Sequence, residues 1–348
     1  MLIKQAKSVA CDWALREASR LPGVHGLYLA GSVNWLPDDA VLPPTSDVDL
    51  NVVFTGRPQA ITPSKFVYGG VLLGVTSLSV DELRSPEQVL GHYHLAGGFR
   101  TPSVILDPSG QLTALQRAVS RDFAMVEWVR RRCQHARSRV LHQLEAWNAS
   151  DPFYDQVVGW LFPAGVTTHV LLVAGLQNPT VRRRYAAARE LLENYGQLEF
   201  YEELLELLGC ARISRGRVAQ HLTVLTEAFD AAQATIKTPL PFASDVSDAA
   251  RPIAIDGSRE LIDRGFHREA VFWMAVTYSR CQKVLAADAP VARRGRFDTG
   301  YGELVGDLGI ASSADLQRRA EQVKVLLPRV MEVAEAIIAA NPEIKGEA

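Results

Sequence analysis

Two aspartates, Asp47 and Asp49, stand two residues apart at the start of an apolar run of the sequence. Because side chains alternate across a β-strand, residues two apart project from the same face, so these carboxylates should converge on one point. Two adjacent carboxylates repel each other and are costly to remove from water, so we expect a cation beside them. Such oxygen ligands suit magnesium, which proteins hold with one or two carboxylates together with substrate phosphates.

The Gly31-Ser32 pair, at the end of the preceding apolar run, offers the second half of such a site. A glycine there lets the backbone approach a phosphate, and the following turn presents N–H groups and a hydroxyl. Either motif alone is common: an Asp-x-Asp is usually a solvated turn or an ion-pair partner. The order strand, Gly-Ser, loop, strand with two acids favours a phosphate cradle that faces a metal held by Asp47 and Asp49.

Two further polar segments contain candidate site residues. His92 and His94 precede two glycines and Arg100, and neutral imidazoles can act as general bases. We take His94 as the candidate base and Arg100 as a candidate phosphate contact, the alternative being a buried structural histidine. Residues 182–184 are three arginines at a helix start, of which at least one should point toward the domain interface. Arg183 is the candidate there, the alternative being a solvated helix face with ion pairs.

The elements that position these residues predict an α+β fold. Alternating or apolar runs indicate strands, whereas apolar residues at a spacing of three and four indicate helices. We expect a helix over 7–21 and strands over 24–31, 47–54, 65–79 (a pair with its turn at 69–70) and 103–106. Helices are expected over 112–147, 153–174, 178–196, 197–208, 214–235, 257–286 and 313–340, with linkers over 237–257 and 289–302. The prediction is a small mixed-sheet domain over 1–115 and an all-helical domain over 116–348.

Composition limits the class of protein. A chain of 348 residues exceeds the usual size of a single core, so two domains are expected. The net charge of −2 argues against a nucleic-acid or membrane surface, which would favour a basic excess. The four cysteines have no CxxC spacing, so neither a zinc site nor a disulfide framework is indicated, and a cytoplasmic location is expected. The charged N-terminus does not resemble a signal peptide, and we expect no segment long enough to span a bilayer.

The stretch LAGSVNWLPDDAVLPPTSDVDLNVVF, residues 29–54, resembles the signature of the polymerase-beta-type nucleotidyltransferase superfamily. The likeness is closest to the antibiotic (aminoglycoside and lincosamide) nucleotidyltransferases, which join a small sheet domain to a helical bundle. It implies transfer of a nucleoside monophosphate from a nucleoside triphosphate to a hydroxyl of a small metabolite or antibiotic. It further implies two magnesium ions on Asp47 and Asp49 and an acceptor bound by the helical domain, with a homodimer left open. The nucleotide-binding residues expected are Gly31, Ser32, Ser46, Arg100 and Arg183.

The sequence departs from this family at one position. The family usually supplies a third carboxylate from a neighbouring strand, and in our alignment that position is Gly74; no acid lies between Asp49 and Asp81. A base from the helical part could replace it, with Asp122, Glu127 and Glu190 as candidates beside His94. The alternative is an altered family member that binds a nucleotide but performs other phosphate chemistry or none. A second alternative, a nucleic-acid-modifying or toxin–antitoxin nucleotidyltransferase, would require a basic groove.

Overall fold

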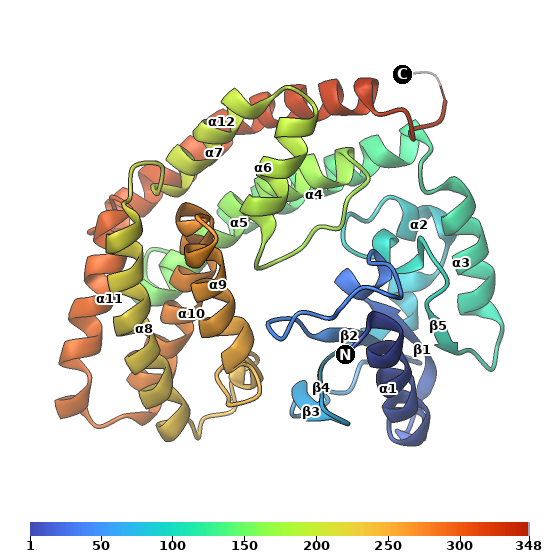
Figure 1. Cartoon of the computed structure of the whole chain (residues 1–348), viewed down its shortest axis with the longest axis horizontal. Coiled ribbons are helices and arrows are strands. Elements are labelled where there is room, and N and C mark those ends of the chain that lie inside the picture. Colours follow the sequence, from blue (N-terminus) through green and yellow to red (C-terminus); the bar gives the residue numbers. More distant parts are fainter. Residues whose placement is uncertain (347–348) are drawn as a thin grey trace.

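The computed structural model of the chain describes residues 1–346, and its fold is α+β as the sequence predicts. A mixed five-stranded sheet in the order β3-β4-β2-β1-β5 forms the N-terminal part, and helices form the rest (Figure 1). In the sheet β2 and β4 are parallel, whereas the other neighbouring strands are antiparallel. The strands are β1 (Val24–Ala30), β2 (Val48–Phe54), β3 (Lys65–Tyr68), β4 (Val71–Ser79) and β5 (Val104–Leu106).

The two faces of the sheet are buried differently. Helix α1 (Ile3–Arg16) covers one face, and its apolar side, which includes Ala10 and Trp13, forms a small separate cluster with that face. On the other face, Tyr28 and Val53 belong to the large cluster that continues through the helical part. The two hydrophobic clusters among residues 1–346 therefore do not divide at residue 115, because one sheet face shares its core with the helices.

The expected helix over 112–147 is two helices, α3 (Gln111–Asp122) and α4 (Val126–Glu145). The buried Arg132 donates hydrogen bonds to the carbonyl of Phe123 at the break (2.7 Å) and to the carbonyl of Leu90 (3.2 Å). The C-terminal segment also reaches this point, where the backbone N–H of Val126 donates to the carbonyl of Lys345 (2.9 Å). The break thus has partners for the backbone groups that a continuous helix would have satisfied.

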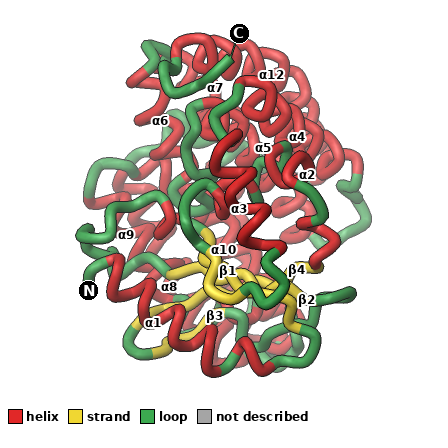
Figure 2. The backbone as a smooth tube through the Cα atoms, turned by 90° about the vertical axis from the view of Figure 1, so that its right-hand side faces the viewer, coloured by secondary structure: helices red, strands yellow, loops and turns green. Residues whose placement is uncertain are grey.

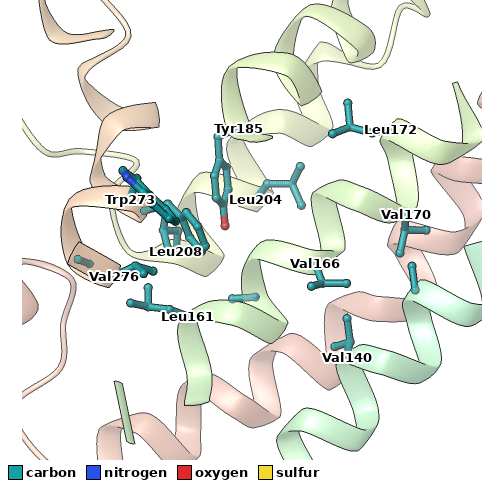
Figure 3. Close-up of a cluster of buried hydrophobic side chains, with 14 of the residues drawn as sticks. Val140, Leu161, Val166, Val170, Leu172, Tyr185, Leu204, Leu208, Trp273 and Val276 are labelled. Atoms are coloured by element: carbon teal, nitrogen blue, oxygen red, sulfur yellow. The ribbon is translucent and has the colours of Figure 1, made fainter. Parts of the chain in front are cut away.

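The helical part surrounds α5 (Phe153–Ala174), which packs against α4, α6 (Arg184–Asn194), α10 (His267–Asp288) and α12 (Ser313–Ala340). Figure 2 shows α4, α5 and α12 above the sheet end of the molecule, and Figure 3 shows apolar side chains of α5 together with Val140 of α4, Tyr185 of α6 and Val276 of α10. The remaining α-helices of residues 1–346 are α2 (Pro86–Leu90), α7 (Leu198–Leu208), α8 (Arg215–Thr235), α9 (Gly257–Asp263) and α11 (Gly295–Asp307).

The expectation that no segment reaches membrane-spanning length was wrong in one respect. Helix α5 has 22 residues and a mean hydropathy of 1.7 in its most apolar window, which satisfies the length and composition of a spanning helix. However, 83% of that window is buried inside the protein. A helix that is apolar on all sides needs such burial, and α5 obtains it as the central helix of the core.

Three helix predictions also need correction. The expected helix over 257–286 is interrupted at Gly265, whose φ of +87° ends α9 in a left-handed conformation that favours glycine. The segment 289–302, expected to be a linker, lies largely in α11, which buries Phe297 and Tyr301 despite its glycines. The helix expected from residue 178 begins at Arg184. Composition near glycine and proline therefore misplaced helix boundaries but not the fold class.

Candidate functional site

Asp47 and Asp49 lie where the polypeptide enters β2, next to the end of β1. Ala30 pairs with Asp49 across these strands, so Gly31 meets the carboxylate of Asp49 directly. A Cβ at Gly31 would overlap Oδ2 of Asp49 and lie 2.7 Å from its Cγ, and the φ of Gly31 is +67°. Glycine is therefore required here both by the backbone conformation and by the close approach of the acid. Ser32 follows and begins a short 3-10 turn, Ser32–Asn34.

Gly74 faces the two aspartates, at the position that the sequence alignment chose for the missing acid. Asp49 pairs with Gly74 across β2 and β4, and Gly74 pairs with Lys65 across β4 and β3. A Cβ at Gly74 would lie 3.0 Å from Oδ1 of Asp49 and 3.2 Å from Oδ2 of Asp47. Since glycine has no side chain, the space above it is open to the side chain of Lys65.

Lys65, on the strand beyond Gly74, contacts Asp47 of the acidic pair. Its Nζ lies 3.0 Å from Oδ2 of Asp47 and 3.3 Å from Oδ1 of Asp245, and only 16% of its side chain is exposed. Although burial disfavours the ammonium, the charges of Asp47 and Asp245 raise the pKa of Lys65 above its usual value. The sequence analysis did not single out Lys65, although it predicted the strand that begins there. The structure places this strand, β3, at one edge of the sheet.

Asp245 was missed because it lies in the segment 237–257, which looked like a linker. It ends a short turn, Ala243–Asp245, and its Oδ2 forms an ion pair with Nη1 of Arg280 at 3.0 Å. The neighbouring Ser244 hydroxyl accepts a hydrogen bond from the backbone N–H of Ser64 at 3.0 Å, which fixes this turn against the start of β3. The helical part therefore supplies a carboxylate beside the aspartate pair, and no local signal marks it.

The donors present fit one divalent ion better than two. Asp47 is ion-paired with Lys65, whereas neither oxygen of Asp49 forms a hydrogen bond or ion pair within residues 1–346. Burial and the charge of Asp47 raise the pKa of Asp49 to about 7. Among the described residues no group of three or more histidine, cysteine or acidic side chains is arranged to hold a metal. A magnesium ion that arrives with phosphates would find Asp49 and Asp47 as ligands, and Gly74, at the position where the resemblance predicts a third carboxylate, supplies none.

A cleft of about 1240 Å³ lies between this edge of the sheet and the helical part. On the helical side, its walls come from the segment that follows α5, from α6 and from the segment after α12. This volume exceeds that of ordinary small-ligand sites, about 300–1,000 Å³, and has room for two molecules at once. The residues predicted to hold the metal and the phosphates, and the candidate base His94, line it: Gly31, Ser32, Ser46, Asp47, Asp49, His94, Arg100 and Arg183.

Arg100 lines the cleft, but its guanidinium already has partners there. It lies 4.7 Å above the ring of Trp35, donates to the carbonyl of Leu176 (3.1 Å) and pairs with Glu343 (3.5 Å). These contacts join the sheet part to the segments that follow α5 and α12. Arg100 therefore links the two parts of the chain, and a phosphate would have to compete with these partners.

His94 lies on the helical side of the cleft. Desolvation and the charge of Arg184 lower its pKa, so the ring is neutral near pH 7 and able to accept a proton. It forms no hydrogen bond or ion pair with Asp47 or Asp49, all three lying in the described part of the chain. The charge that affects its pKa is that of Arg184, and the role of His94 as the replacement base stays a prediction.

Of the three carboxylates expected as alternative bases, Glu190 alone lines the cleft. Asp122 pairs with Arg121 at 2.7 Å at the end of α3, and Glu127 is exposed in the first turn of α4. Glu190 lies on α6, in the wall opposite the sheet. The structure thus selects one of the three by position.

The neighbouring arginines Arg182 and Arg183 differ in what they contact. Arg182 donates to the carbonyls of Gly257 (3.0 Å) and Thr45 (3.2 Å), and so ties the loop before the aspartates to α9. The side chain of Arg183 lines the cleft and has no hydrogen bond or ion pair with any residue of the range 1–346. Within the described residues, the guanidinium of Arg183 is thus not engaged by a protein group and lines the cleft, where we predicted one arginine of residues 182–184 to point.

Four histidines, one of which is the cleft-lining His94, surround Tyr93: His92, His94, His135 and His169. The ring centroids of His92 and His135 are 4.2 Å apart. Nδ1 of His92 accepts hydrogen bonds from the backbone N–H groups of His94 (3.2 Å) and Leu95 (3.1 Å). Burial, and then the charge of His135, lower the pKa of His92 to about 3. These rings are therefore structural in their neutral form.

This cluster predicts acid sensitivity. Because the folded state holds the pKa of His92 below the unfolded value of about 6.5, the unfolded chain binds more protons between these values, and stability must fall as pH falls through that window. We expect urea unfolding at pH 5.5 to give a free energy about 1–2 kcal/mol lower than at pH 7.5. His92→Asn keeps an acceptor for the backbone without titrating, so its loss should be smaller. An equal loss in both proteins would contradict this assignment.

No protein-family model matches the chain, and no curated protein matches its sequence. A functional assignment for this chain therefore depends on the geometry of the cleft.

Proposed function

We propose that the cleft binds a nucleoside triphosphate with magnesium and transfers its nucleoside monophosphate to a hydroxyl of a small metabolite or antibiotic. The observation that carries the proposal is the contact of Gly31 with the carboxylate of Asp49, beside Asp47, in the wall of a cleft large enough for two ligands. This places a backbone turn suited to phosphates against acids suited to the accompanying cation. A cytoplasmic location and a small-molecule acceptor stay predictions with it.

Each residue has a distinct part in this reaction. Asp49 and Asp47 would hold magnesium, which supplies charge neutralisation for the phosphates when bound. Gly31, Ser32 and Ser46 face the same space and would position the phosphates, with Arg183 from the opposite wall. The acceptor oxygen forms a bond to the α-phosphorus as the α–β bridge breaks and pyrophosphate leaves. Glu190 is the candidate for the proton of that hydroxyl.

Calorimetric titration with each nucleoside triphosphate and magnesium tests the proposal. We expect the native chain to bind at least one nucleotide. Asp47→Asn/Asp49→Asn should bind it about 100-fold more weakly or worse, because the cation loses its ligands. The matched control is Asp38→Asn/Asp39→Asn, which removes two exposed acids outside the cleft lining and should bind as the native chain does. Equal binding by the native chain and the site variant, or no binding of any nucleotide, would overturn the proposal.

A second candidate function is favoured by Gly74 and by the ion pair between Lys65 and Asp47. In this alternative the chain binds the nucleotide but does not transfer it, since the third carboxylate is absent. Pyrophosphate release, measured with a panel of hydroxylated acceptors that includes aminoglycosides and lincosamides, separates the two. Nucleotide binding without pyrophosphate release above that of the Asp47→Asn/Asp49→Asn variant would favour the alternative.

The two neighbouring arginines give a sharper test of the phosphate wall. Arg183→Ala should weaken triphosphate binding about 10–100-fold, because it removes a charged donor, while unfolding stays within about 0.5 kcal/mol of the native chain. Arg182→Ala should instead lower the free energy of unfolding by about 1–3 kcal/mol, because two carbonyls lose their donor. Calorimetry and urea unfolding of both variants provide the two measurements. Reversed effects would contradict the assignment.

A further inference from the structure

We propose that the Lys65 ammonium is a built-in cation that replaces one of two divalent ions, so that the cleft takes a nucleoside triphosphate with a single metal ion. The inference rests on the proposed function for its ligand. It starts from the place of Lys65, whose Nζ lies between carboxylates of the sheet part and the helical part.

The register of the sheet explains how Lys65 reaches the aspartates. Asp49, Gly74 and Lys65 lie opposite one another on β2, β4 and β3, and therefore share one face. Because Gly74 has no side chain, the chain of Lys65 passes over it to reach Asp47. A third carboxylate at position 74 would occupy this same space, since even a Cβ would lie 3.0–3.2 Å from oxygens of both aspartates. A carboxylate at position 74 and the side chain of Lys65 would therefore exclude each other from this space.

The charges around Lys65 alternate in sign. Asp47 contacts Lys65, Lys65 contacts Asp245, and Asp245 contacts Arg280, at 3.0, 3.3 and 3.0 Å. Arg280 is in turn held over the ring of Trp273 at 5.3 Å, so Asp245 is held from both sides. This series is neutral by itself and leaves Asp49 as the one acid of the group without an ion pair in the described range. One unpaired acid calls for one further cation, not two.

The ammonium also has a donor to spare. A lysine donates three hydrogen bonds, and Asp47 and Asp245 account for two directions. Lys65 itself lines the cleft, so its third donor is available to an oxygen of a bound phosphate or acceptor. A divalent ion in this place would contact the same oxygen by coordination. The ammonium differs in that it is part of the protein and does not exchange with metal ions in solution.

The first test counts metal ions on the native chain. Electron paramagnetic resonance with Mn²⁺ and a non-hydrolysable triphosphate analogue should give one protein-bound ion per chain in total, after the Mn²⁺ held by unbound analogue in solution has been subtracted. Two ions per chain would overturn the inference while leaving the proposed function in place. Absence of any analogue binding would overturn the proposed function, and the inference would then be decided by the binding of Mn²⁺ alone.

The second test uses Mn²⁺ without nucleotide. Lys65→Ala leaves Asp47, Asp49 and Asp245 around the vacated space, so this variant should bind Mn²⁺ at least tenfold more tightly than the native chain. The control is Lys7→Ala, which removes a lysine from an ion pair with Asp38 (2.8 Å) outside the cleft and should gain nothing. If folded Lys65→Ala gains no more than the control, the inference fails. If Lys65→Ala does not fold, the ion count on the native chain decides.

Discussion

Replacing Gly31 by alanine is expected to weaken nucleoside triphosphate binding more than about 100-fold and to destabilise the fold by about 2–5 kcal/mol. Two penalties combine at this position. The φ of +67° is strained for any residue with a Cβ, and that Cβ would overlap the carboxylate of Asp49. The collision moves the acid that would hold the cation, so binding falls together with stability. Calorimetry and urea unfolding measure the two effects.

A control separates strain from collision. Gly56 has a φ of +81°, yet a Cβ there would meet nothing within 4 Å. Gly56→Ala should therefore lose about 1 kcal/mol of stability from backbone strain alone and bind nucleotide normally. If Gly31→Ala binds as Gly56→Ala does, then the contact between Gly31 and Asp49 has no part in the site.

Trp160→Ala is expected to lower the free energy of unfolding by about 3–5 kcal/mol, the largest loss of stability from a single side chain that we predict. Trp160 is fully buried in the large hydrophobic cluster, on the central helix α5. The segment that follows α5 lines the cleft from Gly175 onward, so a cavity in the helix core should also loosen that wall. Urea unfolding of the variant measures the loss.

Val325→Ala is the matched surface control for this change. Val325 is 79% exposed on α12, so its replacement should change stability by no more than about 0.5 kcal/mol. Similar losses for Trp160→Ala and Val325→Ala would mean that α5 is not the centre of the helical core.

The strands and the pair of motifs were predictable because their signals are local. An alternating stretch that becomes wholly apolar marks β2, and Gly69-Gly70 marks the turn between β3 and β4. The face shared by Asp47 and Asp49 follows from a period of two residues. The alignment with the family chose Gly74 as the position of the expected acid, and the structure pairs Gly74 with Asp49. Helix breaks were harder, because the break at Phe123 depends on the distant Arg132 and Lys345.

The sequence by itself determined the α+β class, the strands of the site and several residues that line the cleft, since backbone periodicity and glycine geometry are encoded within a few neighbouring residues. Only the tertiary structure decided that Lys65 pairs with Asp47 and with Asp245, some 180 residues further along the chain. It also distinguished the tied Arg182 from the free Arg183. The physical reason is that ion pairs depend on distances between side chains after folding, and no spacing along the chain records those distances.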